Sequence, residues 1–320
     1  MTEVVFLKQN AEKWKQFEAL LRHKGQPDPD RLAELFVEIT DDLSYARTFF
    51  PKSRTARYLN DLAAEIHQAI YKNKREDRRR FLTFWTREVP LVVRQSHREL
   101  GGSLAIFLIA LSIGVVSTLN DAGFARLILG DTYVNMTLEN IEKGDPMAVY
   151  KDMGQVDMFM AITFNNVRVA FFAFAMGVLA SFGTAYVLFS NGVMIGVFHT
   201  LFLQQDYLLP SLMVVYIHGT LEISAIIIAG GAGLVMGNSL LFPGTYARGQ
   251  AFRRAARRGA KIIIGLVPVF IAAGFLESFV TRYTEMPPLL SLLIIGGSLG
   301  FILWYFIAYP IHLSRSKHHV

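Results

Sequence analysis

The sequence contains no cysteine, and this absence excludes several classes of protein at once. None of the 320 residues is Cys. A secreted scaffold held by disulfides, a zinc module with thiolate ligands and an enzyme with a catalytic thiol are therefore excluded. Charged residues are scarce, at 18% of the chain, whereas soluble globular proteins carry about 25%. Hydrophobic residues reach 52%, so the composition favours a membrane protein over one compact soluble domain.

Motifs for nucleotide chemistry are absent as well. The sequence contains no Walker loop and no dinucleotide-binding fingerprint. The Gly-rich stretch at 230–233 lies in an apolar run without Lys, so it does not cradle a phosphate. We therefore expect a protein that is not an enzyme and that needs no cofactor.

The first 98 residues are polar and are expected to lie in the cytoplasm. They hold 19 of the 32 Lys and Arg residues. The amino terminus lacks the apolar core and the cleavage site of a signal peptide. Apolar residues recur at helical spacing in three segments, with breaks at Gly25-Gln26-Pro27 and Pro51-Lys52-Ser53. Residues 1–77 are therefore predicted to form a cytoplasmic antiparallel helical bundle.

A basic segment at 78–98 joins this bundle to the apolar part of the chain. Arg78, Arg79 and Arg80 precede a stretch rich in aromatic residues and valine, and Pro90 is expected to kink it. The pattern favours an amphipathic juxtamembrane helix that lies among anionic lipid headgroups. A fourth bundle helix with a solvated basic face is the alternative. Nucleic-acid binding is not expected, because acidic residues are spread through the same region and no recognition motif is present.

Residues 99–320 contain six candidate membrane spans, each with about the length that a bilayer core requires. The predicted spans are 100–119, 161–189, 192–208, 211–237, 261–281 and 289–311. Polar residues follow the third apolar run quickly, so it fits either a short span or a re-entrant hairpin. The predicted fold is an all-α polytopic membrane protein with a cytoplasmic helical bundle at its amino terminus.

Charge predicts the orientation of the spans. The expected loop 244–261 contains six basic residues and no acidic one, so the positive-inside rule places it in the cytoplasm. The segment 121–157 contains seven acidic residues against three basic ones and is placed outside. A cytoplasmic amino terminus then requires an even number of crossings before 244–261. The number is even only if the third apolar run crosses the membrane, so this run is predicted to be a full span. Both termini are predicted in the cytoplasm, with the protein in the plasma (inner) membrane. The basic residues expected at the membrane surface include Arg253, Arg254, Arg257 and Arg258.

Four ionisable residues fall inside the predicted spans: His199, His218, Glu222 and Glu277. Such groups are costly in lipid and by default suggest function. His218 and Glu222 share a helix face because they are four residues apart. Three interpretations stay open: a polar cluster that sets helix register, a path for protons or ions, and a metal site with further ligands from the other two residues. The polar cluster is favoured, and no metal is predicted.

Polar residues at the outer mouth of the second span form a second candidate set. They are Asn165, Asn166 and Arg168. One role for them is to cap the helix and anchor it at the interface. The alternative is that they bind an anionic headgroup or a loop of a partner.

Small residues recur at helical spacing along several spans. They are Ala173, Gly177, Ser181, Gly192, Gly196, Gly233 and Gly237. Such residues let helix backbones approach closely in lipid. Packing within one bundle is the expected role, and the seam of a dimer is the alternative.

Several short motifs together resemble the stage II sporulation protein M family of prokaryotic membrane proteins. They are Asn165-Asn166, Asn191-Gly192-x-x-x-Gly196, His218-Gly219-x-x-Glu222 and Ala273-Gly274-x-x-Glu277. The resemblance covers nearly the whole chain and implies a multi-spanning membrane protein without known catalysis. The founding member of the family is a scaffold that recruits cell-wall hydrolases to the septum of spore formers. Genes of the family often lie near those for a MoxR-type ATPase.

The expected function is therefore a non-catalytic membrane scaffold of the cell envelope. It is expected to form a homo-oligomer, with a dimer favoured, and to bind envelope proteins or a MoxR-type ATPase. A proton- or ion-coupled transporter or channel that uses the intramembrane His and Glu residues is the alternative. An intramembrane metallohydrolase ranks last.

Overall fold

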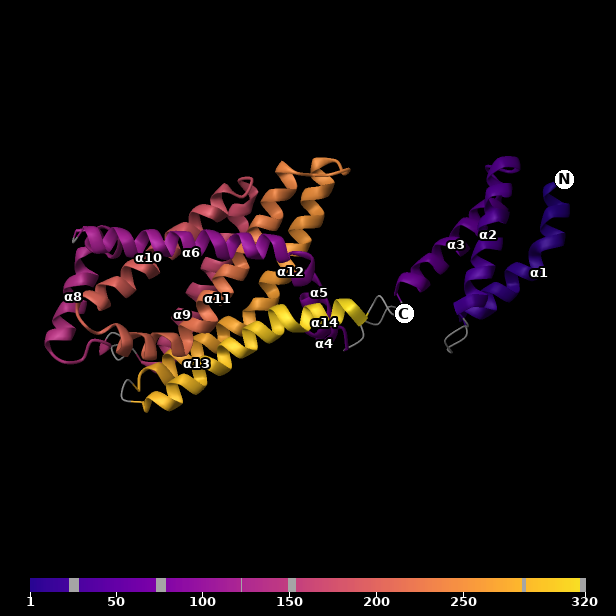
Figure 1. The fold of residues 1–320 in the computed structure, drawn as a ribbon. Coiled ribbons are helices and arrows are strands. Elements are labelled where there is room, and N and C mark those ends of the chain that lie inside the picture. The colour runs from indigo at the N-terminus through magenta and orange to yellow at the C-terminus, as the bar shows by residue number, and fades with distance from the viewer. Residues whose placement is uncertain (23–28, 73–78, 122, 149–153, 284–285, 317–320) are drawn as a thin grey trace. The chain divides into compact units, whose positions relative to one another are not determined.

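The computed structural model describes residues 1–22, 29–72, 79–121, 123–148, 154–283 and 286–316. All regular secondary structure in these ranges is helical, which confirms the predicted fold class. The chain divides into two compact units, Met1–Arg80 and Phe81–Val320, and each is described here by itself (Figure 1). Arg78 of the predicted basic segment lies outside the described residues.

The first unit consists of three helices that follow the three predicted segments. They are α1 (Glu3–Arg22), α2 (Pro29–Phe49) and α3 (Arg54–Lys72). Each helix contributes fully buried side chains to one core, among them Phe17, Ile39 and Leu59. The unit therefore has a hydrophobic core of its own.

A buried tryptophan ties α1 to α2 in this core. Trp14 is 2% exposed, and its Nε1 donates a hydrogen bond of 2.8 Å to Asp42 Oδ2. Lys13 Nζ lies 2.6 Å from the same carboxylate oxygen. The indole N–H therefore has a hydrogen-bond acceptor, which a buried tryptophan usually needs.

The second unit holds six helical segments that are long and apolar enough to cross a membrane, counted over the described residues. They are His97–Asn120, Gln155–Val178, Phe182–Gln204, Leu208–Leu241, Arg248–Thr281 and Pro288–Arg315. With the labels of Figure 1, the segments are α6 (His97–Asn120), α9 (Gln155–Ala175) with η3 (Met176–Val178), α10 (Phe182–Gln204), α11 (Leu208–Leu241), α12 (Arg248–Phe275) with η4 (Leu276–Thr281), and α13 (Pro288–Leu303) with η5 (Trp304–Ala308) and α14 (Tyr309–Ser316).

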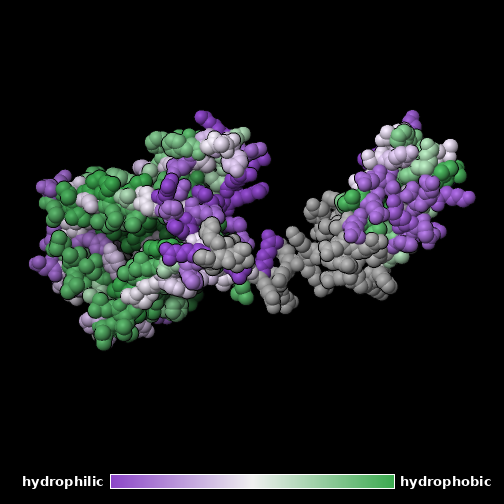
Figure 2. All heavy atoms as spheres, turned by 45° about the vertical axis from the view of Figure 1, so that its right-hand side comes forward, coloured by the Kyte–Doolittle hydropathy of each residue, from purple (hydrophilic) through white to green (hydrophobic). Residues whose placement is uncertain are grey.

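The surface of the second unit is largely apolar, as expected for contact with lipid tails. Figure 2 shows hydrophobic residues over much of the visible face of this unit. Leu108, Ile109, Phe164 and Leu293 are among its exposed large apolar side chains. Because an exposed apolar surface of this extent is unfavourable in water, the protein is a multi-pass membrane protein.

The turn between the second and third spans lies at Ala180 and Ser181, which corrects both predicted boundaries (161–189 and 192–208). These two residues adopt positive φ angles of 50° and 72°, a left-handed region that non-glycine residues rarely occupy. Such strain persists where surrounding contacts hold it, and Ser181 Oγ donates a 3.1 Å hydrogen bond to Asn238 Oδ1 on α11. The third span is a complete helix of 23 residues, so the re-entrant alternative is wrong.

The small residues of the predicted ridges face other helices of the same chain. A Cβ atom on Gly177 would collide with the backbone of Gly233, and one on Gly192 would lie 2.6 Å from the carbonyl oxygen of Phe107. The buried members of the set are Ala173, Gly177, Gly192, Gly196, Gly233 and Gly237. Their contacts fit packing within one bundle. Ser181 lies in the turn after η3, so it does not continue the helix face of Ala173, contrary to the prediction.

The arginine-rich stretch is mostly helical, which corrects the predicted loop at 244–261. The helix α12 begins at Arg248, so only six residues separate it from the end of α11, at 242–247. One face of its first turns is buried through Ala251 and Ala255. Arg253 and Arg257 lie on the exposed face. The basic residues therefore project from a rigid helix end.

The segment before the first span is also built differently from the predicted kinked helix. It consists of α4 (Arg79–Thr83), the π-helical turn η1 (Phe84–Glu88) and α5 (Val89–Gln95). Pro90 lies just after the π-helical turn, and Glu88 and Val89 before it keep helical backbone angles. Val89 and Val93 of α5 are buried in the core of the second unit. The α5 part of this segment thus packs on the core of the second unit, whereas Phe81 and Leu82 of α4 are exposed.

The segment between the first two spans forms two short helices. They are α7 (Phe124–Leu129) and α8 (Asp131–Glu142). Ala125 of α7 is buried in a small cluster with Val193 and Val197 of α10. This end of the unit is therefore capped by helices that pack on the spans.

Candidate functional site in the membrane unit

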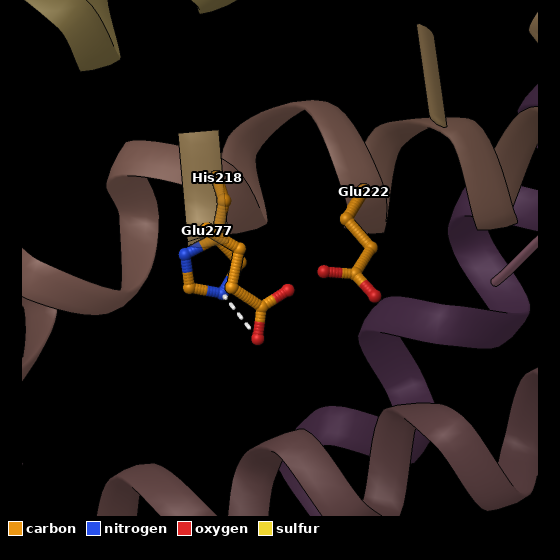
Figure 3. Close-up of side chains that lie close together, drawn as sticks. All are labelled: His218, Glu222 and Glu277. Carbon is orange, nitrogen blue, oxygen red and sulfur yellow. Dashed lines mark ion pairs between the residues drawn. The ribbon is translucent and has the colours of Figure 1, made fainter. Parts of the chain in front are cut away.

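Three ionisable side chains from two spans meet inside the second unit. His218 and Glu222 lie one turn apart on α11, and Glu277 comes from η4 at the end of α12. Figure 3 shows the three side chains directed toward a common space. One ligand atom from each residue lies within 4.8 Å of the others. The structure therefore joins residues that lie on two consecutive spans.

The imidazole of His218 is held from both sides. Its Nε2 lies 3.8 Å from Glu277 Oε1, and its Nδ1 lies 3.0 Å from Thr281 Oγ1. The hydroxyl of Thr281 donates a 3.2 Å hydrogen bond to the carbonyl oxygen of Leu276. Because that hydroxyl proton is already used, Thr281 Oγ1 accepts from Nδ1–H. In the neutral ring, Nε2 then carries a lone pair on the side of Glu277.

The π-helical turn η4 sets this geometry. Glu277 and Thr281 both lie on this turn, and both contact His218. A π-helical turn shifts the register of the side chains that follow it, and such turns recur at functional sites. The sequence pattern Ala273-Gly274-x-x-Glu277 gives no sign of it, so the contribution of Thr281 was missed.

Gly274 has a visible structural role in that motif. A Cβ atom at this position would collide with Thr163 Oγ1 of α9. The absence of a side chain therefore lets α9 approach α12 closely. This approach brings Asn166, three residues after Thr163, to the same part of the unit as Glu277.

A cavity of about 320 Å³ adjoins the group, and it unites two sets that the sequence presented separately. It is lined by Ala161, Ile162, Asn165, Asn166, Glu222 and Glu277. Asn166 is only 6% exposed. Arg168 is exposed, and its Nη2 donates a 3.2 Å hydrogen bond to Asn165 Oδ1. The amides predicted at the mouth of the second span thus line the same space as the intramembrane carboxylates.

His199, the fourth predicted ionisable residue, does not join this group. Its Nδ1–H donates a 2.6 Å hydrogen bond to the carbonyl oxygen of Ile195, one turn earlier on α10. The ring packs against Tyr216, with 5.6 Å between ring centroids. It is absent from both the ligand group and the cavity lining. His199 is therefore not part of a path or ligand set shared with the other three residues.

A serine pattern that the sequence reasoning missed carries no site. Residues 296–300 read Gly-Gly-Ser-Leu-Gly, which has the spacing of a nucleophile elbow. An elbow needs a sharp turn between a strand and a helix. This pattern lies inside the helix α13, so Ser298 is an ordinary residue of a span.

The architecture defines a class: an all-helical multi-pass membrane protein with a buried His–Glu–Glu group beside an amide-lined cavity. Residues 103–282 match the stage II sporulation protein M family, and the chain belongs to this family. The matched range includes His218, Glu222, Glu277 and Asn166. It confirms the resemblance drawn from the motifs for residues 103–282, and not for nearly the whole chain as expected. The family is not known as one of enzymes.

The first unit has a family match of its own. Residues 4–72 match a domain of unknown function, DUF8413. No curated protein matches the chain, and no solved structure matches it.

Proposed function

We propose that this protein is a non-catalytic scaffold of the cell envelope that recruits partners through its first unit. The six-helix unit holds it in the plasma (inner) membrane with both termini in the cytoplasm. The observation that supports this best is the separate hydrophobic core of Met1–Arg80. A unit with its own core and its own family match is suited to a separate task, such as binding a protein.

The orientation within this proposal follows from charge. The end of the unit with Arg253 and Arg257 faces the cytoplasm, because positive charge is retained on that side. The opposite end, with α7 and α8, faces outward. The His–Glu–Glu group lies toward that outward end, since Glu277 is four residues before the end of its span.

Association of the protein with itself is part of the proposal. In the apolar window of the span Pro288–Arg315, only 17% of the residues are buried within the chain. Cβ positions at Gly296 and Gly300 on α13 meet no other atom within 4 Å. Open glycine positions on a poorly covered helix allow a second helix to approach closely, which is consistent with a homodimer.

The scaffold proposal is tested by comparing the full chain with a variant that lacks residues 1–77. Both are extracted in mild detergent after crosslinking in cells, and partners are identified by mass spectrometry. A purified MoxR-type ATPase from the same organism is added to each in a direct binding assay. We expect cytoplasmic partners with the full chain alone, while the thermal stability of the membrane unit stays the same in both. Recovery of the same partners from both would contradict the proposal.

A proton- or ion-coupled transporter or channel is the second candidate, and the buried carboxylates beside a cavity favour it. The test is flux into proteoliposomes across a range of pH and cations. This candidate expects flux that Glu222→Gln or Glu277→Gln abolishes and that His199→Gln leaves intact. Background flux in the unmodified protein under all conditions removes this candidate.

A further inference from the structure

We propose that His218, Glu222 and Glu277 form a binding site for a divalent transition-metal ion of the Zn²⁺ type, with one coordination position open to the adjoining cavity. The sequence alone ranks this interpretation below a polar cluster. The geometry of the three side chains reverses the order. This site is independent of the scaffold function and can exist with or without it.

The first argument is the donor set. The three residues supply one imidazole nitrogen and two carboxylate groups, and their ligand atoms lie within 4.8 Å of one another. Zn²⁺ takes such ligands at about 2.0–2.2 Å, which places neighbouring donors roughly 3.3 Å apart. A difference of this size is within the range that side-chain rotation of two glutamates covers. The backbone therefore already places three ligands around one point.

The second argument is the partner of His218. A histidine that binds a metal through one nitrogen commonly donates its other N–H to a neighbouring acceptor, which fixes the ring and its tautomer. Thr281 Oγ1 fills this role at 3.0 Å from Nδ1, and its own proton is engaged by the Leu276 carbonyl. Nε2 is thus the ring nitrogen that faces the carboxylates.

The third argument is charge. Glu222 and Glu277 face each other inside a membrane unit, where two negative charges are costly and repel. One divalent cation neutralises both. In the competing arrangement, protonation of a carboxyl group removes the repulsion, and the pair binds no metal.

The ligand class and the open position follow from the same geometry. Imidazole favours Zn²⁺, Fe²⁺ and their neighbours over Mg²⁺ and Ca²⁺, which prefer oxygen ligands throughout. Three protein ligands leave a fourth position, as in zinc sites that take a ligand from solution. The cavity of about 320 Å³ beside Glu222 and Glu277 provides that position with space for water. Asn166 on its wall supplies an amide that can hydrogen-bond to such a ligand.

The experiment measures Zn²⁺ binding by the full, tag-free chain in lipid nanodiscs after removal of metal with a chelator. Equilibrium dialysis with elemental analysis gives the stoichiometry, and calorimetry gives the affinity. We expect about one Zn²⁺ per chain. Co²⁺ in place of Zn²⁺ gives the visible absorption of a tetrahedral nitrogen–oxygen site. A stoichiometry near zero, or loss of the ion on a second dialysis, would overturn the proposal.

Three single variants identify the ligands: His218→Gln, Glu222→Gln and Glu277→Gln. Each should weaken Zn²⁺ binding by about 100-fold or more, while Thr281→Val should weaken it by about 10–100-fold, as loss of a supporting hydrogen bond does. Thermal unfolding without metal shows whether each variant is folded. If a ligand variant does not fold, the stoichiometry and the Co²⁺ spectrum of the unmodified protein still decide.

Two matched controls separate this site from other histidines of the chain. His199→Gln removes an intramembrane histidine outside the group and should leave binding unchanged. His318→Ala combined with His319→Ala removes the paired histidines of the carboxyl-terminal tail and should also leave it unchanged. Loss of binding in the tail variant, with retention in the three ligand variants, would assign the ion to the tail and overturn the proposal.

Discussion

A Cβ atom on Gly192 of α10 would lie 2.6 Å from the carbonyl oxygen of Phe107 on α6. Real Cβ atoms do not approach a backbone oxygen this closely, so the two helices pack with almost no space between their backbones. Gly196, one turn later, meets α6 at Leu111 in the same way. These contacts fix the position of the third span against the first.

We predict that Gly192→Ala destabilises the membrane unit. The added methyl group must push α10 away from α6, and overpacking of this kind costs about 1–3 kcal/mol. Thermal unfolding in detergent, followed by circular dichroism, measures the effect. Gly249→Ala on α12 is the control, because a Cβ atom there meets nothing within 4 Å. An equal loss of stability in both variants would mean that the close helix contact is not responsible.

The number of spans could be predicted from the sequence, whereas the boundary between the second and third spans could not. An apolar run of about twenty residues is a local signal, and it is sufficient to predict a crossing. The turn at Ala180 and Ser181 gives no such signal. It lies within one continuous apolar stretch and uses positive φ at residues that are not glycine. Hydrogen bonding to Asn238, far along the chain, holds it in place.

The candidate site shows the same division between local and long-range information. The shared face of His218 and Glu222 follows from their spacing of four residues. Glu277 and Asn166 lie near these two residues because of the way η4 and α9 pack on α11. The spacing of residues in the sequence does not predict this packing. His199 was grouped with these residues because of its chemistry alone, and its position on α10 separates it from them.

The proposed topology predicts which positions a membrane-impermeant thiol reagent reaches. Because the chain has no cysteine, single-cysteine variants report one position each. In intact cells, Thr132→Cys on α8 should be labelled and Thr245→Cys between α11 and α12 should not. Both positions are exposed in the structure. After permeabilisation both should react, which controls for access. Labelling of Thr245→Cys in intact cells would contradict the orientation.

The first unit is predicted to fold without the membrane unit. A fragment of residues 1–80 should unfold cooperatively in urea, since its core is complete within Met1–Arg80. Phe17→Ala should lower its free energy of unfolding by about 3–5 kcal/mol, because Phe17 is a large side chain deleted from a core. The side chain of Phe17 is 0% exposed.

Val37→Ala is the matched control for this fragment. Val37 is 58% exposed on α2, and substitutions at such surface positions usually change stability by less than about 0.5 kcal/mol. Circular dichroism at increasing urea concentration measures both variants. A fragment without a cooperative transition would show that the unit depends on the rest of the chain.

The basic start of α12 is predicted to bind anionic lipids. Arg258 is already engaged with Glu99, at 3.6 Å, and Arg254 lies 4.1 Å from the centre of the Tyr246 ring. Arg253 and Arg257 project from the exposed face, so they are the residues best placed to meet headgroups. Basic residues near an anionic surface contribute about 1 kcal/mol each.

The double variant Arg253→Gln with Arg257→Gln should therefore retain fewer anionic lipids, with an affinity lower by about 30-fold if both contributions add. Native mass spectrometry of the protein released from phosphatidylglycerol-containing detergent micelles counts the retained lipids. Arg126→Gln with Lys143→Gln removes the same charge from exposed residues of the segment between the first two spans and serves as the control. Because the prediction depends on local placement and not on net charge, an equal loss of lipid in the two double variants would refute it.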